Sequence, residues 1–266
     1  MLMKSKISSK FEELKKKRQK ALITYITAGD PSLAVTEKLV FELERSGADI
    51  IELGVPFSDP LADGPVIQAS HVRALKRDVS TEQVLALVKK VRAKSEVPIV
   101  LMISYNLIAR YGIDKFFADS KIAGVDGVIP PDLSLEEAGE LRKKAGGIDT
   151  IFLVSPASDD ERVSQISQAA SGFIYLVSLT GVTGARKALP VDVKDNVARI
   201  RKFTDKPVAV GFGVSSPAQV KKISGLADGA IVGSAIVRLI DENKGKKAML
   251  KKVGSFVKKL KSATVH

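Results

Sequence analysis

The segment PVAVGFGVSSPAQVKKISGLADGAIVGS, residues 207–234, contains one complete repeating unit of the chain. It begins with a short apolar run, continues with an amphipathic stretch that starts at Ser216-Pro217, and ends with a second apolar run after a turn at Gly225. Near-continuous apolar runs of this kind are typical of parallel strands that are covered on both faces, and a helix is their usual connection. The segment therefore predicts a strand, a helix and a second strand.

The same alternation extends over the rest of the chain. Polar start signals stand before several amphipathic stretches, such as Ser80 with Gln83 and Ser134 with Glu137. Eight such units in 266 residues predict one closed (β/α)8 barrel, a TIM barrel, because an open sheet of that width would usually need a longer chain. The predicted strands are ALITYITA from Ala21, DIIELGV from Asp49, PIVLMIS from Pro98, VDGVIP from Val125, DTIFLVS from Asp149, FIYLVSL from Phe173, PVAVGFG from Pro207 and DGAIVGS from Asp228.

The excess positive charge lies at the two ends of the chain. The formal net charge is +12, but residues 1–20 contribute +6, residues 244–266 contribute +8, and residues 21–243 contribute −2. Both ends have apolar residues at helical spacing. We predict a single domain over residues 1–266, with a basic N-terminal helix in 1–20, the barrel in 21–243 and a basic C-terminal helix in 244–266. Lysines on the outer faces of docked helices explain this charge, and polyanion binding is the alternative.

Composition excludes several kinds of chemistry. The chain has no cysteine and two histidines, which excludes disulfides, iron–sulfur clusters and a cysteine nucleophile and makes a metal site unexpected. No apolar run approaches the roughly 20 residues of a membrane span, and the first residues lack the apolar segment of a secretory signal, so a cytoplasmic location is expected. Catalysis would then depend on carboxylates, hydroxyls, backbone amides or a cofactor.

Glu52 is the one charged residue in the interior of the run DIIELGV, where it shares a face with Ile50 and Gly54 by strand alternation. Barrel enzymes have their active sites at the carboxyl ends of the strands. A carboxyl group that points into the barrel mouth would have a raised pKa, which suits a general acid/base near neutral pH. The alternative is a buried ion pair, although no other predicted strand interior contains a cation.

The loop GVPFSDPLADGP, residues 54–65, is long for a connection of this type and is predicted to be a lid. It brings Asp59 and Asp63 to the same region, where two carboxylates could divide acid/base duty from charge stabilisation. Either aspartate could instead form a turn or cap a helix. His71 follows the loop, and we expect it to be a surface or capping residue.

Three glycine-bearing turns follow the last three predicted strands, at 180–184, 211–213 and 233–234. Exposed backbone amides beside a helix N-terminus form a typical phosphate site, so these turns predict phosphate binding. Four aromatic residues at or near strand ends could line an apolar pocket, although core packing explains each of them as well: Tyr25, Phe57, Tyr175 and Phe212.

The motif ELGVPFSDPLADGP, from Glu52 to Pro65, closely resembles the signature of the tryptophan synthase alpha chains, and the resemblance runs from Tyr25 to the C-terminal helix. The segments GVTG, GFG and GSAIV, which begin at Gly181, Gly211 and Gly233, match the phosphate-side loops of that family. The resemblance implies a TIM-barrel lyase that cleaves indole-3-glycerol phosphate to indole and glyceraldehyde 3-phosphate in tryptophan biosynthesis.

The resemblance also implies roles for particular residues. Glu52 matches the acid/base of the family, and Asp63 matches the aspartate that steadies the indole nitrogen. The residues that would bind the substrate phosphate or lie near it are Gly184, Gly213, Gly233, Ser234, Tyr175 and Thr183, while Tyr25 and Phe212 are the candidate pocket aromatics.

Partners follow from the same resemblance. This chain would carry no cofactor, and a beta chain with pyridoxal phosphate would receive the indole in a complex of two alpha and two beta chains, in part through Asp59 and Pro60. No nucleic acid or membrane partner is expected. The alternatives from the residues alone are another phosphate-binding barrel enzyme, such as a sugar-phosphate isomerase, and a non-catalytic barrel that binds polyanions.

Overall fold

The computed structural model describes residues 4–60, 63–177, 193–211 and 213–265. In these residues, nine strand segments form one sheet: β1 Ala21–Thr27, β2 Ile50–Gly54, β3 Ile99–Met102, β4 Gly127–Ile129, β5 Asp149–Thr150, β6 Leu153–Val154, β7 Ile174–Val177, β8 Val208–Gly211 and β9 Gly229–Val232. The same residues contain twelve helices: α1 Lys6–Lys16, α2 Leu33–Arg45, α3 Pro65–Leu75, α4 Thr81–Arg92, α5 Tyr105–Tyr111, α6 Ile113–Ala123, α7 Gly139–Lys144, α8 Asp160–Ala169, α9 Val193–Arg201, α10 Pro217–Ser224, α11 Ser234–Asn243 and α12 Met249–Ser262.

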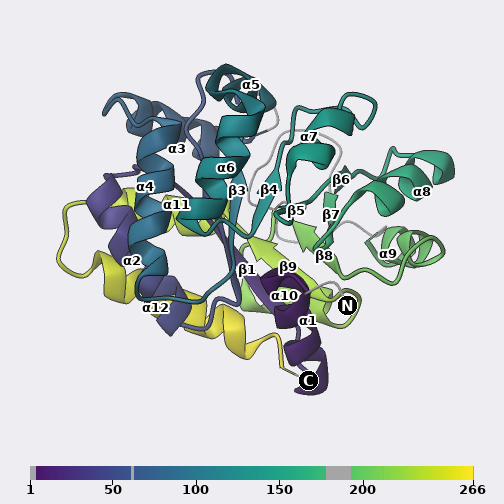
Figure 1. The fold of residues 1–266 in the computed structure, drawn as a ribbon. Coiled ribbons are helices and arrows are strands. Elements are labelled where there is room, and N and C mark those ends of the chain that lie inside the picture. The colour runs from purple at the N-terminus through teal and green to yellow at the C-terminus, as the bar shows by residue number, and fades with distance from the viewer. Residues whose placement is uncertain (1–3, 61–62, 178–192, 212, 266) are drawn as a thin grey trace.

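The strands lie at the centre of the fold, with helices around them (Figure 1). They pair in parallel in the order β5-β4-β3-β2-β1-β9-β8-β7-β6. The segments at the two ends of this order, β5 and β6, belong to one run that the sequence predicts as a single strand. Its first half pairs with β4 and its second half with β7, so the run is divided because each half bonds to a different neighbour. The predicted (β/α)8 barrel is confirmed, since this run joins both ends of the sheet.

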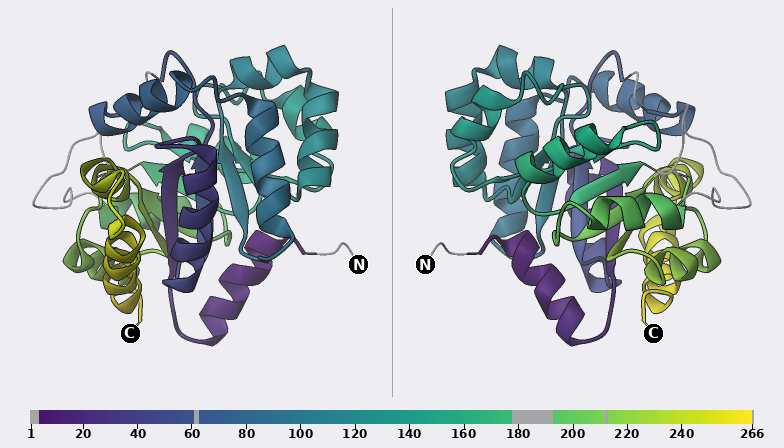
Figure 2. Two further views of the ribbon diagram at one scale, coloured as in Figure 1. Left: turned by 90° about the vertical axis from the view of Figure 1, so that its left-hand side faces the viewer. Right: turned by 90° about the vertical axis from the view of Figure 1, so that its right-hand side faces the viewer.

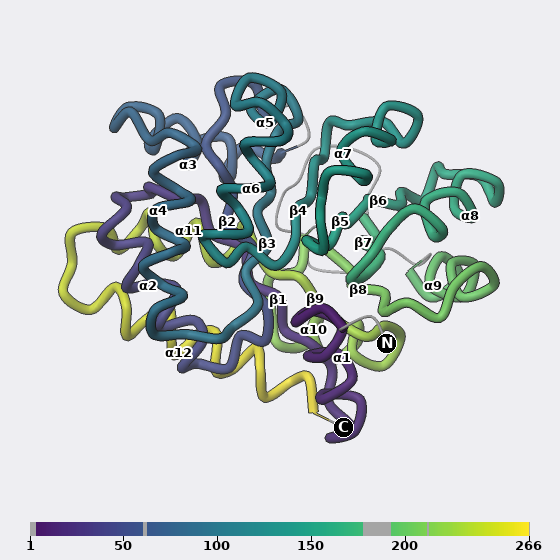
Figure 3. The backbone as a smooth tube through the Cα atoms, viewed as in Figure 1, coloured from purple at the N-terminus to yellow at the C-terminus, as the bar shows by residue number. Residues whose placement is uncertain are grey.

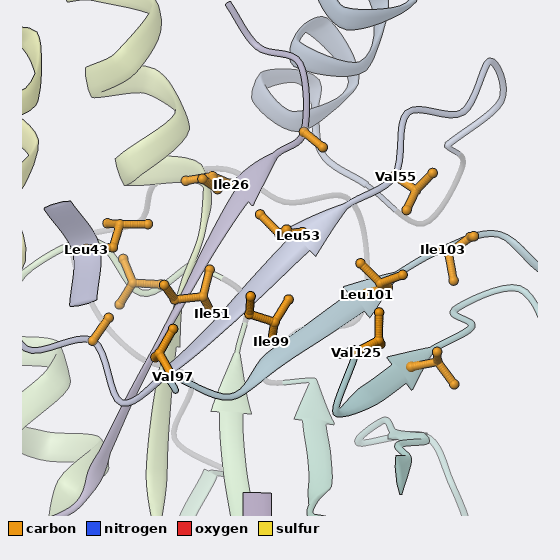
Figure 4. Packing of buried hydrophobic residues seen from close by; sticks show 14 of the residues in the cluster. Ile26, Leu43, Ile51, Leu53, Val55, Val97, Ile99, Leu101, Ile103 and Val125 are labelled. Atoms are coloured by element: carbon orange, nitrogen blue, oxygen red, sulfur yellow. The ribbon is translucent and has the colours of Figure 1, made fainter. Parts of the chain in front are cut away.

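In the described residues, one or two helices follow each strand segment except β5, and these helices lie outside the barrel (Figure 3). Side chains on the outer face of the strands pack against them in one large cluster, part of which Figure 4 shows with Leu53 and Leu101 side by side. A second cluster fills the inside of the barrel and includes Ile23, Ile50 and Phe173. Alternation along β2 therefore sends Ile50 inward and Leu53 outward, which places Glu52 on the inner face.

The two terminal helices cover different parts of the barrel. Helix α1 lies at the end of the barrel where the strands begin (Figure 2). Its buried residues Ile7, Phe11 and Leu14 join the inner cluster. The ring centres of Phe11 and Phe173 lie 5.8 Å apart. Helix α12 packs on the outside against α2 and buries Met249, Val253, Val257 and Leu260. Both predicted terminal helices are thus present, and their apolar faces are docked.

An aspartate precedes each of three strands and links it to the strand before it. In each case one carboxylate oxygen accepts the backbone N–H of the preceding strand, at 2.7 to 3.0 Å. A lysine or arginine also contacts each of these carboxylates. The pairs are Asp49 with Leu22, Asp126 with Ile99, and Asp228 with Val208. Each aspartate therefore ties the start of its own strand to the start of the preceding one.

Most of the predicted helix starts are correct. Ser80 and Gln83 form a capping box at α4, and Ser216 caps α10, which has Pro217 in its first turn. The prediction at Ser134 is wrong by several residues. The Oγ of Ser134 donates to Glu137 at 2.7 Å, but the next residues form a turn and α7 begins only at Gly139.

Candidate active site

A cavity lies at the carboxyl ends of the strands, and seven of the predicted site residues meet in its wall. The described residues that line it are Tyr25, Glu52, Asp63, Ile67, Met102, Tyr175, Gly213, Val214, Ile231, Gly233 and Ser234. Three other predicted residues, Thr183, Gly184 and Phe212, lie outside the described residues. Phe57 and Asp59 are described but do not line the cavity, and Asp59 is exposed.

Glu52 is completely buried at the inner face of β2, in register with Tyr25 on β1 and Val100 on β3. Within the described part of the chain, neither of its carboxyl oxygens has a hydrogen-bond partner. Burial raises the pKa of Glu52 from 4.5 to about 8. The alternative of a buried ion pair is not supported among the described residues, and Glu52 is a neutral acid at pH 7 that can donate a proton.

Two tyrosines flank Glu52, and each lies over a glycine of a neighbouring strand. A Cβ atom on Gly54 would lie 2.0 Å from the hydroxyl oxygen of Tyr25, and one on Gly211 would lie 2.4 Å from that of Tyr175. Only glycine leaves room for these phenols. Burial raises the pKa of both tyrosines well above 10, so both stay protonated.

Asp63 reaches the cavity from the loop after β2. Its backbone N–H donates to the carbonyl oxygen of Pro60 at 3.0 Å, and Gln68 donates to the carbonyl oxygen of Asp63 at 2.8 Å. Its side chain is 15% exposed, and Oδ2 lies 3.5 Å from Nε2 of His71. The cavity thus has one deeply buried carboxyl group and a second that is close to solvent.

The prediction for His71 is wrong. It lies within α3 rather than at the start of this helix, and it is buried at 4% exposure. Its ring contacts the loop through the backbone of Phe57 and contacts β1 through the hydroxyl of Tyr25. No signal in the local sequence indicates these contacts, because both partners come from other elements.

The opposite wall of the cavity has the features of an anion site. Gly213 has a positive φ of 77°, a conformation that favours glycine. Gly233 immediately precedes α11, whose first turn begins at Ser234. The first amides of a helix have no acceptor within the helix, and the helix dipole places partial positive charge beside them. The described part of this wall therefore suits a phosphate group.

The described residues also give information about metal binding and membrane insertion. They contain no group of three or more His, Cys, Asp or Glu side chains placed to hold a metal ion. In the same part of the chain, no helix combines the length and the apolar character that a membrane span requires.

A family model described as tryptophan synthase alpha chain matches residues 11–265. The chain belongs to the tryptophan synthase alpha chain family. It is 50% identical over 260 residues to the tryptophan synthase alpha chain of Geotalea uraniireducens, with 97% of each chain covered. It is 48% identical over 259 residues to that of Thermoanaerobacter sp. strain X514, with 97% of this chain and 98% of the relative covered.

Solved structures agree with this assignment. A structure of Mycobacterium tuberculosis tryptophan synthase superimposes with a TM-score of 0.92 at 35% identity, covering 99% of this chain and 100% of the other. The tryptophan synthase alpha chain of Legionella pneumophila gives a TM-score of 0.90 at 36% identity, with 98% of each chain covered. As a tryptophan synthase alpha chain, the protein is a lyase that catalyses the alpha reaction of tryptophan biosynthesis. The predicted family and activity are confirmed in preference to the two alternatives.

Proposed function

We propose that the chain cleaves indole-3-glycerol phosphate to indole and glyceraldehyde 3-phosphate in this cavity, with Glu52 as the acid/base and Asp63 as the stabilising carboxylate. The observation that carries this assignment is the buried, neutral carboxyl group of Glu52 in the wall that also holds Asp63. Cleavage requires a proton at indole C3, loss of a proton from the adjacent glycerol hydroxyl, and stabilisation of positive charge on the ring. Two carboxyl groups in different environments meet these three needs.

The steps balance around Glu52. The neutral acid donates its proton to C3, which places positive charge on the indole ring. The resulting carboxylate takes the proton of the glycerol hydroxyl while the carbon–carbon bond to C3 breaks. The electron pair of that bond returns to the ring and neutralises its charge. Indole and the aldehyde leave, and Glu52 is protonated as at the start. Asp63 accepts a hydrogen bond from the ring N–H and lowers the energy of the cation.

The substrate phosphate binds at the opposite wall in this proposal. The amides at Gly213, Gly233 and Ser234 supply hydrogen bonds, and the start of α11 supplies partial positive charge. Tyr25 and Tyr175 line the space between the phosphate site and the carboxyl groups. The sequence motifs add Thr183, Gly184 and Phe212 to the same site.

Family membership supports a further part of the proposal, which concerns the partner. A tryptophan synthase beta chain that carries pyridoxal phosphate receives the indole, in a cytoplasmic complex of two alpha and two beta chains. No cofactor is assigned to this chain, because the proposed steps need only its two carboxyl groups and the anion site.

Indole release from indole-3-glycerol phosphate tests the proposal, with the purified chain measured alone and with a beta chain. We expect slow release by the chain alone, acceleration by the beta chain, and loss of release in Glu52→Gln. Glu161→Gln is the matched control, since Glu161 is exposed in the first turn of α8. Wild-type release by Glu52→Gln, or no release by the folded wild-type chain in either setting, would contradict it.

A further inference from the structure

A continuous row of hydrogen bonds connects the loop after β2, helix α3 and strand β1, and it includes Tyr25 of the cavity wall. The backbone N–H of Phe57 donates to Nδ1 of His71 at 3.0 Å, and Nε2 of His71 lies 3.2 Å from the hydroxyl oxygen of Tyr25. That hydroxyl lies 3.3 Å from Oγ1 of Thr27, which lies 2.5 Å from Oγ of Ser70. Ser70 donates to the carbonyl oxygen of Ile67 at 2.6 Å.

The two ends of this row determine the direction of every bond in it. The amide of Phe57 can only donate, and the carbonyl of Ile67 can only accept. Ser70 uses its proton on Ile67, so Thr27 must donate to Ser70 and the hydroxyl of Tyr25 must donate to Thr27. His71 therefore accepts at Nδ1 and carries its proton on Nε2, as a neutral imidazole.

The proton on Nε2 of His71 also faces the carboxylate of Asp63. Oδ2 of Asp63 lies 3.5 Å from Nε2, so the N–H that the hydroxyl of Tyr25 accepts also lies beside this carboxylate. The ring is buried and held by Phe57, whereas Asp63 belongs to a loop and is 15% exposed in its side chain. A fixed donor beside a carboxylate on a loop restricts the directions in which that carboxylate can point.

We propose that His71 is a positioning residue for Asp63, whose carboxylate it holds toward the cavity with a neutral Nε2–H. This inference rests on the proposed role of Asp63. It adds a residue from α3 that contacts neither the breaking bond nor the phosphate wall. His71 acts through Asp63, so its contribution should vanish when Asp63 can no longer act.

A double-mutant cycle tests this dependence by indole release, with His71→Leu, Asp63→Asn and the combined variant. We expect His71→Leu to lower kcat by about tenfold to a hundredfold, the range for a hydrogen bond to a charged group, with little change in KM. In the Asp63→Asn background, His71→Leu should lower kcat by less than about twofold. His71→Gln should recover most of kcat, because its amide can donate from the position of Nε2.

Each outcome separates the inference from the proposed function. Loss of activity in Asp63→Asn together with wild-type kcat in His71→Leu would overturn the role of His71 alone. Equal losses from His71→Leu in both backgrounds would show a general structural role and would also overturn it. Wild-type activity in Asp63→Asn would overturn both proposals.

The wild-type protein offers a second test, which reads the protonation of each ring nitrogen of His71 directly. The chain has two histidines, His71 and His266, so nitrogen-15 NMR of the rings gives few signals, and His71→Gln identifies the one from His71. We expect a ring with a protonated Nε2 and an unprotonated Nδ1 at neutral pH. A protonated Nδ1 in His71 would overturn the inference.

Discussion

Replacement of Glu52 by glutamine should stabilise the folded chain while it abolishes catalysis. Burial raises the pKa of this carboxyl group from 4.5 to about 8, so the unfolded chain releases the proton at a lower pH than the folded chain. Below pH 4.5 both states are protonated and burial carries no ionisation penalty. As the pH rises toward 8, the unfolded state alone gains from ionisation, and the wild-type protein loses stability.

The size of this effect follows from the shift in pKa. Each pH unit between the two values costs the wild-type folded state about 1.4 kcal/mol. At pH 7 the accumulated cost is on the order of 3 kcal/mol, given a folded pKa of about 8. Glutamine has almost the same shape and cannot ionise, so Glu52→Gln escapes the cost. Its free energy of unfolding should therefore exceed that of the wild type by an amount that grows with pH.

Urea unfolding, followed by circular dichroism at about pH 5, 6, 7 and 8, measures the free energy of unfolding of both proteins. The difference should be below about 1 kcal/mol at pH 5 and on the order of 3 kcal/mol at pH 7. In the same samples, indole release should fall by at least about a hundredfold in Glu52→Gln. Glu161→Gln controls for the loss of a carboxylate outside the cavity. A stability difference that does not change between pH 5 and pH 8 would refute the reasoning from burial.

Three further substitutions probe the rest of the cavity by steady-state indole release. Asp63→Asn should lower kcat by about a hundredfold because the ring cation loses its counter-charge, and an unchanged kcat would contradict this role. Gly211→Ala places a Cβ 2.4 Å from the hydroxyl oxygen of Tyr175, so the displaced phenol should lower kcat/KM by about tenfold or more, and unchanged kinetics would exclude a role for its position. Ser234→Asp puts a negative charge at the start of α11 and should raise KM at least about tenfold, whereas Ser234→Asn should not, and equal KM values would place the phosphate elsewhere.

The main features of the fold are predictable from hydrophobic periodicity, because alternating runs report which elements are buried. Periodicity does not report which neighbour a strand residue bonds to, so the run at 149–154 is predicted as one strand although its halves pair with different strands. Helix starts at Ser80 and Ser216 are local and therefore predictable. The turn after Ser134 shows that the same local bond can form without a helix directly after it.

In the site too, features that depend on neighbouring residues are predictable, and contacts between distant segments are not. Glu52 is conspicuous as a charge within an apolar run, so its burial is predictable. Asp59 and Asp63 belong to one loop, and only the folded path of that loop distinguishes the exposed residue from the one in the cavity. The contacts of His71 join α3 to β1 and to the loop, so its sequence neighbours carry no sign of them.

A crystal structure of the Glu52→Gln variant with indole-3-glycerol phosphate bound would test the central claim most directly. The account predicts the indole N–H against the carboxylate of Asp63, C3 and the glycerol hydroxyl beside residue 52, and the phosphate on the amides of Gly213, Gly233 and Ser234. A phosphate bound away from the start of α11, or an indole ring turned away from Asp63, would contradict the account.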